Sequence, residues 1–471
     1  MTDVVLDLPV DTADSATRIE YDFLGEVAVP AERYYGAETM RAIRNFPITG
    51  TPISAMPELL MALAWIKKAA AQTNLVSGDL SDDQATAIVA ACDEILAGKL
   101  HSEFCLDVIQ GGAGTSTNMN ANEVIANRAL EIMGHQRGDY AHMSPKDHVN
   151  KCQSTNDVYA TAIRLTVVQM NRRLAAATLR LVEAFERKAE EFHHIPKLGR
   201  TQLQDAVPMT VGQEMQAFAD TLRDDVARIE EMQPLFMQVN MGGTAIGTGV
   251  GATDYYMHHI VPNLAQVADM AITPSHNRIE ATWDTGLFVF YSGLLKRLAT
   301  KLSKISNDLR LLSSGPLSGI GELCLPQMQP GSSIMPGKVN PVIPEVMNQI
   351  CFRVFGGDTT VTFAAEAGQL QLNAMEPVII WTLYESCSAL ITGMDTLIEN
   401  CVNGIRVDEF RTAQLLQGST ALVTSLMPDI GYANASRVAR TMIETKIGIA
   451  DALRLLLPEQ ADRLIRQYLM T

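Results

Sequence analysis

The chain has 471 residues, of which 47% are hydrophobic and 19% charged, a composition typical of a globular protein and not of a disordered one. It carries 37 lysines and arginines against 53 aspartates and glutamates, so its formal charge is −16. Such an acidic chain is poorly suited to bind nucleic acid or acidic lipid, although a local site can still hold an anion. No window of about 18 uninterrupted apolar residues occurs, so we expect no membrane span and no membrane partner.

The seven cysteines and the N-terminal segment both indicate a cytoplasmic protein. The cysteines are scattered, odd in number and form no CxxC pair, which argues against a disulfide framework or a zinc cluster and for a reducing compartment. The N-terminus is acidic and lacks an apolar stretch, unlike a signal or transit peptide. We expect residues 1–18 to form a flexible lead.

Long helical patterns dominate the chain after a stretch with proline and glycine that extends to about residue 55. In three runs, at 163–185, 211–229 and 287–312, apolar residues recur at spacings of three and four, which predicts amphipathic helices. The first and third runs are much longer than the typical helix of about 11–12 residues. They also carry apolar residues outside a single stripe, which indicates burial on more than one face. We therefore expect a mainly α protein with a bundle of long helices that continues across subunit contacts.

Four polar segments lie between the helical patterns, at 111–123, 150–157, 199–208 and 331–341. Each is rich in hydroxyl and amide side chains and leads into an apolar pattern. A helix N-terminus has unpaired N–H groups and attracts negative charge, and Ser and Thr add neutral donors, so such segments can bind an anion. Helix capping uses the same residue types. The last segment also holds Lys338 in a loop framed by glycine and proline, which favours a binding site.

The motif GSSIMPGKVNP in that last segment resembles the signature of the aspartase/fumarase superfamily. The resemblance extends from about Ile19 to the C-terminal helices, through QGGAGTSTNMNANEV, DHVNKCQSTND, GRTQLQDAVPMT and EAGQLQLNAMEPV in the expected order. It implies a three-domain, mainly α subunit whose long-helix bundle becomes a twenty-helix bundle in a homotetramer, with each active site shared by three subunits. The expected domains are an N-terminal domain at 19–153, a central bundle with the catalytic loop at 154–403 and a small helical domain at 404–471.

The resemblance is closest to the aspartase branch and implies reversible anti-elimination of ammonia from L-aspartate to give fumarate. Loss of a proton beside a carboxylate leaves an aci-carboxylate, which preorganised donors must stabilise. By resemblance Ser332 is the general base, and nearby N–H groups and cationic charge would have to favour its ionised form. By the same resemblance nine residues bind the substrate: Thr115, Ser154, Thr155 and Ser333 at the β-carboxylate and its aci form, Lys338, Asn340 and Thr201 at the α-carboxylate, and Asn156 and Gln202 at the amino group.

Three alternatives stay open. A fumarate hydratase would use the same base and carboxylate contacts, but fumarases, like some aspartases, have histidine after GRT, where this chain has Gln202. Another amino-acid lyase of this fold would release a different amine, and the bulky Trp283 is the one hint of a changed substrate. A non-catalytic helical assembly would have no physical need for the intact 331–341 loop. Hydroxyls, amides and one lysine require no cofactor and no metal, although some aspartases are activated by a divalent cation such as Mg²⁺.

Overall fold

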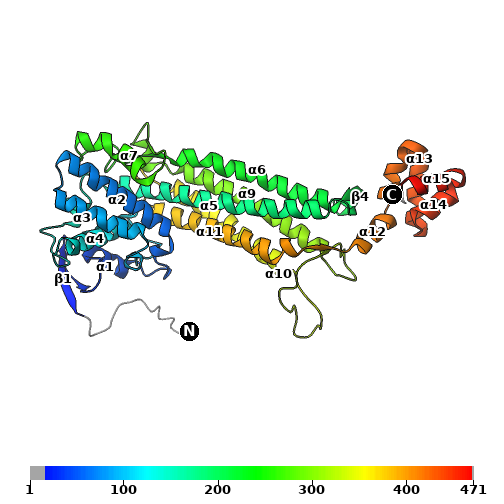
Figure 1. Ribbon diagram of the computed structural model, residues 1–471, viewed down its shortest axis with the longest axis horizontal. Coiled ribbons are helices and arrows are strands. Elements are labelled where there is room, and N and C mark those ends of the chain that lie inside the picture. Colours follow the sequence, from blue (N-terminus) through cyan, green and yellow to red (C-terminus); the bar gives the residue numbers. More distant parts are fainter. Residues whose placement is uncertain (1–15, 469–471) are drawn as a thin grey trace. The chain divides into compact units, whose positions relative to one another are not determined.

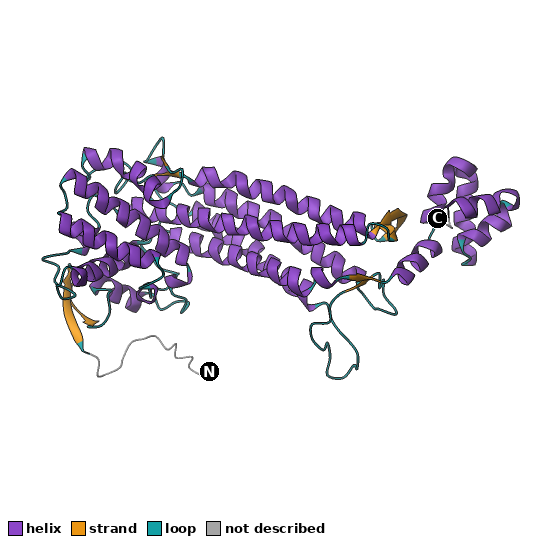
Figure 2. Cartoon of the chain, in the orientation of Figure 1, coloured by secondary structure: helices purple, strands orange, loops and turns teal. Residues whose placement is uncertain are grey.

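The computed structural model describes residues 16–468, which are mostly helical with short strands between the helices (Figure 2). The predicted mainly α class is confirmed. The chain divides into two compact units: unit 1 comprises Met1–Leu174, Arg228–Lys296 and Arg353–Ala389, and unit 2 comprises Ala175–Ala227, Arg297–Phe352 and Leu390–Thr471. The three-domain division expected from the sequence stays a prediction. Most of the expected flexible lead lies outside the described residues, and strand β1 begins at Thr17.

In unit 1 the N-terminal helices pack around α2, whose residues are largely buried. Proline at the first position of α2 and a left-handed Gly78 after its last residue mark its two ends, as is usual for helices. Helix α3 begins with a capping box in which Ser81 and Gln84 satisfy each other's backbone N–H groups. The elements of this part are β1 Thr17–Asp22, β2 Gly25–Pro30, α1 Ala37–Asn45, α2 Pro57–Ser77, α3 Asp82–Leu96, α4 Thr115–Ile132, β5 Gln238–Val239, α7 Asp254–Ala268, β6 Thr273–Pro274 and α8 Glu280–Trp283, with short turns of helix at Ile53–Ala55, His101–Glu103 and Pro145–Val149.

Five long helices supply residues to both units (Figure 1): α5 Thr155–Glu191, α6 Val211–Phe236, α9 Gly286–Leu312, α10 Val342–Glu366 and α11 Glu376–Asn400. The three helical runs predicted from the sequence lie within α5, α6 and α9. Side-chain contacts join these helices inside each unit. In unit 1 the hydroxyl of Tyr291 on α9 lies 3.4 Å from the sulfur of Cys387 on α11, and in unit 2 the rings of Phe185 on α5 and Phe218 on α6 meet edge to face. The predicted bundle of long helices is therefore confirmed.

In unit 2 a hairpin and a small helical cluster accompany the long helices. The hairpin pairs β3 Pro196–Thr201 with β4 Gln204–Thr210, and β7 Leu323–Cys324 pairs with β8 Arg406–Val407. The C-terminal cluster comprises α12 Glu409–Gly418, α13 Ala421–Thr445, α14 Ile449–Leu456 and α15 Pro458–Tyr468, after a helical turn at Val402–Gly404. Its own apolar core includes Leu426, Val438, Leu453 and Leu464. Among the described helices of both units, none is long and apolar enough to cross a membrane.

Candidate active site

Thr115 and Thr155 are the first residues of α4 and α5, whose N-termini lie side by side in unit 1. Asn118 on α4 joins the two helices, because its Nδ2 donates to Thr155 Oγ1 at 3.0 Å. Gly114 precedes α4 with φ 79°, and a Cβ at this position would lie 2.4 Å from the ring of Tyr159 on α5. Two sets of helix N-terminal N–H groups therefore meet at one place, an arrangement that favours a bound carboxylate.

Ser154 and Asn156 are fixed by contacts at the start of α5. Ser154 Oγ accepts from the N–H of Asn156 at 3.2 Å, and the N–H of Ser154 donates to Asp157 Oδ1 at 2.9 Å. Asp157 Oδ2 accepts two further bonds, both 3.0 Å long, from N–H groups in the glycine-rich segment 242–245. Asn156 Nδ2 donates to a carbonyl of the same segment at 2.7 Å. Burial raises the pKa of Asp157 to about 6 although these N–H groups oppose the rise.

Lys67 on α2 is fully buried and supports the loop that leads to α5. Its ammonium donates to Asn150 Oδ1 and to Gln153 Oε1, both at 2.9 Å. Asn150 Oδ1 also accepts from two asparagine side chains of α4 at 3.2 Å each. Burial lowers the pKa of Lys67 to about 7, while the carboxylate of Asp157 opposes that shift. When protonated, this side chain adds positive charge near the N-termini of α4 and α5.

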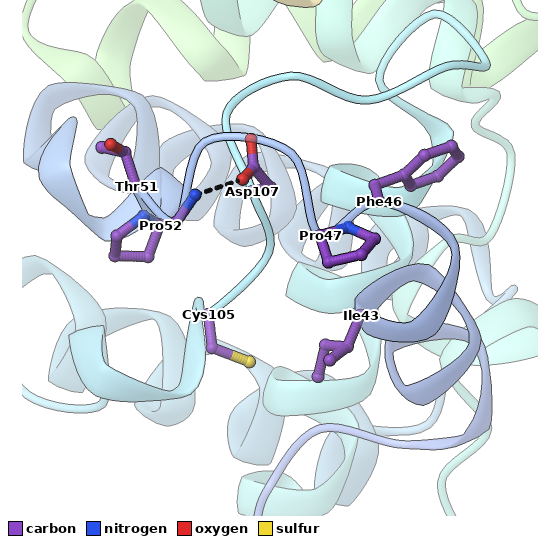
Figure 3. Close-up of a pocket in the computed structure, with 8 residues that line it drawn as sticks. Ile43, Phe46, Pro47, Thr51, Pro52, Cys105 and Asp107 are labelled. Atoms are coloured by element: carbon purple, nitrogen blue, oxygen red, sulfur yellow. Dashed lines mark hydrogen bonds between the residues drawn. The ribbon is translucent and has the colours of Figure 1, made fainter. Parts of the chain in front are cut away.

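A pocket in unit 1 contains none of the predicted site residues (Figure 3). It is lined by Ile43, Phe46, Pro47, Gly50, Thr51, Pro52, Cys105 and Asp107. The carboxylate of Asp107 accepts from the N–H groups of Thr49 and Gly50 at 2.6 and 2.8 Å, so it fixes the turn. Because none of the predicted residues lines it, we assign this pocket no part in the site.

In unit 2, Ser332 and Ser333 lie at the start of a loop whose two ends are joined by hydrogen bonds. The N–H of Gly331 donates to the carbonyl of Lys338 at 2.8 Å, and Asn340 Nδ2 donates to the carbonyl of Gly331 at 3.2 Å. A Cβ at position 331 would lie 2.7 Å from that Lys338 oxygen, so this closure requires glycine. Ser333 and Lys338 are exposed, and Ser332 and Asn340 are half-buried. The loop therefore brings two hydroxyls, an amide and an ammonium into one short segment.

The hydroxyl of Ser332 accepts two backbone hydrogen bonds, from the N–H groups of Ile334 and Met335 at 3.2 and 3.1 Å. Serine hydroxyls in ordinary turns make similar contacts. Two donors on one oxygen also favour its ionised form. The loop therefore meets one requirement for a serine that acts as a base.

Thr201 and Gln202 lie at the tip of the β3–β4 hairpin and are exposed. Gln202 and Leu203 form its two-residue loop with φ of 54° and 61°, a conformation that Asn and Gly adopt more readily. Backbone strain of this kind often marks functional segments, because the surrounding structure has to hold it in place. Within residues 16–468, no hydrogen bond or ion pair joins Thr201 or Gln202 to the 331–340 loop.

A buried ion-pair network holds the base of this hairpin. Glu322 is fully buried, and its carboxylate lies 3.0 Å from Lys197 Nζ and 2.8 Å from Arg200 Nη2, both on β3. Lys197 also contacts Glu214 on α6 at 2.7 Å. Glu322 directly precedes β7 and the segment that leads to the 331–340 loop. One carboxylate therefore ties the hairpin to the approach of the serine loop.

A family model described as Lyase matches residues 25–356, a range that includes all ten predicted site residues. This match spans more than half of the chain. The chain belongs to this family, the lyases of the aspartase/fumarase superfamily.

Individual relatives are similar to this lyase in sequence or structure over nearly its whole length. An aspartate ammonia-lyase of Pseudomonas canavaninivorans is 54% identical over 438 residues, which are 93% of this chain and 92% of the relative. A crystal structure of a fumarate lyase:delta crystallin from Brucella melitensis, bound to cobalt, has a TM-score of 0.93 at 50% identity and covers 96% and 98% of the two chains. A class II fumarase from Schistosoma mansoni has a TM-score of 0.90 at 34% identity, with the same coverage. The expected aspartase/fumarase fold is confirmed.

The structure places the ten predicted residues of this lyase in two groups. The unit 1 group lies at the N-termini of α4 and α5, and the unit 2 group lies in the serine loop and at the hairpin tip. Their assignment to one substrate site stays a prediction. Unit 1 holds Thr115, Ser154, Thr155 and Asn156, and unit 2 holds Thr201, Gln202, Ser332, Ser333, Lys338 and Asn340.

Sequence reasoning does not identify three residues that support these groups: Lys67, Asp157 and Glu322. Lys67 interrupts an apolar helical run, and that interruption is the one sequence signal that points to it. Asp157 and Glu322 stand beside polar loops, where a carboxylate is commonly a solvent-exposed capping residue. Only the packing shows that both are buried and that each holds a candidate segment.

Proposed function

We propose that the chain is an aspartate ammonia-lyase, which eliminates ammonia reversibly from L-aspartate to give fumarate. One observation carries this proposal: a relative with that name is 54% identical over 93% of the chain, whereas the fumarase structure is 34% identical. The local geometry supports it, because donors for an anion are concentrated at two helix N-termini and in a loop with a lysine.

In the proposed reaction Ser332 removes a proton from the carbon that bears the β-carboxylate. The electron pair moves into that carboxylate, which becomes an aci-carboxylate with two negative charges. The carbon–nitrogen bond on the opposite face then breaks, ammonia leaves and the double bond of fumarate forms. The two N–H groups that donate to Ser332 Oγ support its role, because they stabilise the alkoxide more than the hydroxyl.

The β-carboxylate and its aci form are assigned to Thr115, Ser154, Thr155 and Ser333. The first three stand at or beside the N-termini of α4 and α5, where the helix dipoles favour negative charge. These donors stabilise the doubly charged aci-carboxylate more than the singly charged β-carboxylate of the substrate. This difference is the condition for lowering the barrier.

The α-carboxylate is assigned to Lys338, Asn340 and Thr201, with Asn156 facing the amino group and Gln202 beside it. The amide of Gln202 forms hydrogen bonds but does not titrate. An ammonium group carries its own proton when it leaves, whereas a hydroxyl group needs an added proton to leave as water. A neutral amide at this position therefore suits the release of ammonia better than the dehydration of malate.

We further propose that the two groups of residues at one substrate come from different copies of the chain, in a homotetramer whose sites are each shared by three subunits. Four copies of the five long helices would form the expected twenty-helix bundle. Phe290 on α9 and Phe363 on α10 are 62% and 70% exposed, as is typical of a helix face that another chain covers. The cytoplasm is the proposed compartment, because all seven cysteines are free thiols.

The proposed chemistry uses hydroxyls, amides and one lysine, so it requires no cofactor. Activation by a divalent cation such as Mg²⁺ belongs to the proposal as an optional effect. Activity of chelator-treated enzyme, measured with and without added Mg²⁺, tests both parts.

The test of the function is a direct assay. Purified protein is mixed with L-aspartate, and fumarate is followed by its ultraviolet absorbance and ammonia by a coupled reaction. L-malate is run in parallel, and Ser332→Ala is the control. We expect fumarate and ammonia to rise together and to be absent in the variant. Activity on malate alone would identify a fumarate hydratase, and inactivity on both substrates would direct attention to Trp283 and another amine.

A further inference from the structure

The loop after α4 brings two histidines and an aspartate together on the surface of unit 1. His135 Nδ1 and His142 Nε2 lie 3.7 and 3.8 Å from the same oxygen, Oδ2 of Asp139. One ligand atom from each of the three side chains lies within 4.8 Å of the other two. The side chains of His135, Asp139 and His142 are 31%, 41% and 52% exposed, so a dissolved ion can reach them. Across the described chain, no other three His, Cys, Asp or Glu side chains meet in this way.

The backbone of the loop holds this group in place. Gly134 and Gly138 have φ of 82° and 86°, which glycine adopts without strain, and they fold the loop back on itself. The N–H of Gly138 donates to Asn127 Oδ1 on α4 at 2.7 Å, and the N–H of His142 donates to the carbonyl of Asp139 at 3.1 Å. The three side chains are therefore brought together by the fold of the loop, and an ion would not have to gather them from a disordered segment.

The separations between the three side chains suit an ion better than direct contacts. At 3.7 and 3.8 Å, neither histidine nitrogen is within hydrogen-bond distance of Asp139. Nitrogen and oxygen ligands about 2.0–2.2 Å from a tetrahedral ion lie about 3.4 Å apart, a few tenths of an ångström less than observed here. The two imidazole rings are stacked, with centroids 3.9 Å apart and planes 14° from parallel. Because the lone pair of a ring nitrogen lies in the plane of its ring, both imidazoles have to rotate out of this stack before their nitrogens can face one ion.

We propose that His135, Asp139 and His142 bind a divalent transition-metal ion of the type of Zn²⁺ or Co²⁺. Two imidazole nitrogens and one carboxylate oxygen are ligands that such ions favour, whereas Mg²⁺ and Ca²⁺ prefer oxygen ligands throughout. Water completes the coordination on the exposed side. This site is distinct from the proposed reaction, since none of its residues belongs to the two substrate-binding groups.

The position of the site predicts what a bound ion does. The loop connects the end of α4 to the segment that continues into the 150–157 loop, so an ion here fixes the first part of that connection. An ion that binds only the folded chain stabilises it by mass action, and the effect grows with the free ion concentration. The thermal midpoint of unfolding should therefore rise with added Zn²⁺ and not with added Mg²⁺.

The test is a titration of the full-length protein with Co²⁺, after removal of any affinity tag and of bound metal by chelator. Co²⁺ with few ligands absorbs visible light more strongly than the hydrated ion, so binding is read directly from the spectrum. We expect a band that saturates at one ion per chain and disappears when Zn²⁺ is added. His142→Ala and Asp139→Asn should each abolish the band or weaken Co²⁺ binding about tenfold or more.

The matched control is His193→Ala, which removes one of two adjacent exposed histidines in unit 2 for which residues 16–468 supply no third ligand. It should leave the Co²⁺ band unchanged. Equal Co²⁺ binding by the wild-type protein and His142→Ala would overturn the proposal, and so would loss of the band in His193→Ala. Both histidines are exposed, so the variants should fold, and circular dichroism checks that they do.

Discussion

Lys67 and Lys68 are neighbours on α2, but their environments differ. Lys67 is fully buried and donates to two amide side chains of the loop before α5, whereas Lys68 remains partly exposed and pairs with Asp93 at 2.6 Å. The sequence WIKKAAA does not distinguish them, because the helical pattern alone does not tell which polar loop will cover the helix. Local sequence patterns therefore do not predict the burial of a residue whose hydrogen-bond partners lie far away in the chain.

We expect Lys67→Met to destabilise the protein strongly. Gln153 Oε1 loses its ammonium donor, and an unsatisfied buried acceptor costs about 1–3 kcal/mol, whereas Asn150 Oδ1 keeps its two asparagine donors. Lys68→Met removes an ion pair that is partly exposed to solvent, and such a pair is worth about 0–1 kcal/mol. Thermal midpoints measured at one protein concentration compare the two variants with the wild type. If the thermal midpoint falls by a similar amount in both variants, the buried contacts of Lys67 contribute no more to stability than the ion pair of Lys68.

Glu376, at the first position of α11, gives a second prediction at this scale, on pH. Burial raises the pKa of its carboxyl to about 8, while the cation of Arg164 opposes the rise. The folded chain then holds a proton that the unfolded chain releases near its ordinary value, so stability falls as pH rises between these two pKa values. The slope is at most about 1.4 kcal/mol per pH unit.

Glu376→Gln imitates the protonated carboxyl and should lack this slope. The thermal midpoint of the variant should rise relative to that of the wild type as the pH increases from about 5 to about 8. Above that range the difference between the two midpoints should stay constant. Melting curves at a series of pH values measure the difference. Parallel profiles from pH 5 upward would mean that Glu376 is ionised in the folded chain.

Among the elements, three of the five long helices follow from the sequence, and the segments between them do not. The predicted runs lie inside α5, α6 and α9 because a buried helix repeats its apolar residues locally along the chain. The β3–β4 hairpin has no such signal, since its turn is Gln202–Leu203 where a typical hairpin has asparagine and glycine. The candidate loops were predicted by composition and resemblance, but their closure, as at Gly331, depends on contacts that composition does not specify.

The buried carboxylate of Glu322 allows a test of how this hairpin is held. Glu322→Gln leaves Lys197 with one carboxylate partner and weakens the link to Arg200, and breaking a buried pair costs about 3–5 kcal/mol. If the hairpin tip positions substrate, kcat/KM should fall further than the loss of folded protein explains. Thermal melts and kinetics on the folded fraction separate the two effects.

Glu385→Gln is the matched control, because it removes a carboxylate from an exposed pair with Arg353 in unit 1. We expect a change of about 0–1 kcal/mol and normal kinetics. If both variants show the same change in stability and in kcat/KM, the burial of Glu322 does not explain its effect.

At the scale of the whole molecule, the candidate residues are divided between two compact units of one chain. Acidic composition and scattered cysteines predict the general class of protein but not this division. The resemblance to the aspartase/fumarase superfamily predicts the fold, which the relatives confirm, and it also predicts a shared site. That last expectation concerns contacts between copies, so it needs a test in solution.

Mixing two inactive variants provides this test. Thr155→Ala alters the unit 1 group and Ser332→Ala the unit 2 group, so each protein alone should be nearly inactive. If a site takes these residues from different subunits, random reassembly of equal amounts should restore about a quarter of the wild-type activity. The measurement is activity after dissociation and reassociation of the mixture, with each variant treated alone as the control. No recovery, despite mixed tetramers detected by mass, would contradict shared sites.

The loop closed by Gly331 also determines where the chain can be cut. Ile334 is 84% exposed and Met335 47%, and the N–H groups of both donate to Ser332 of the same loop. A protease should therefore cleave here before it attacks the packed helices. A single cut would separate Ser332 from Lys338 in sequence, while the rest of the fold keeps the two fragments together. The cleaved protein would keep its size and helical content in solution but lose its reaction.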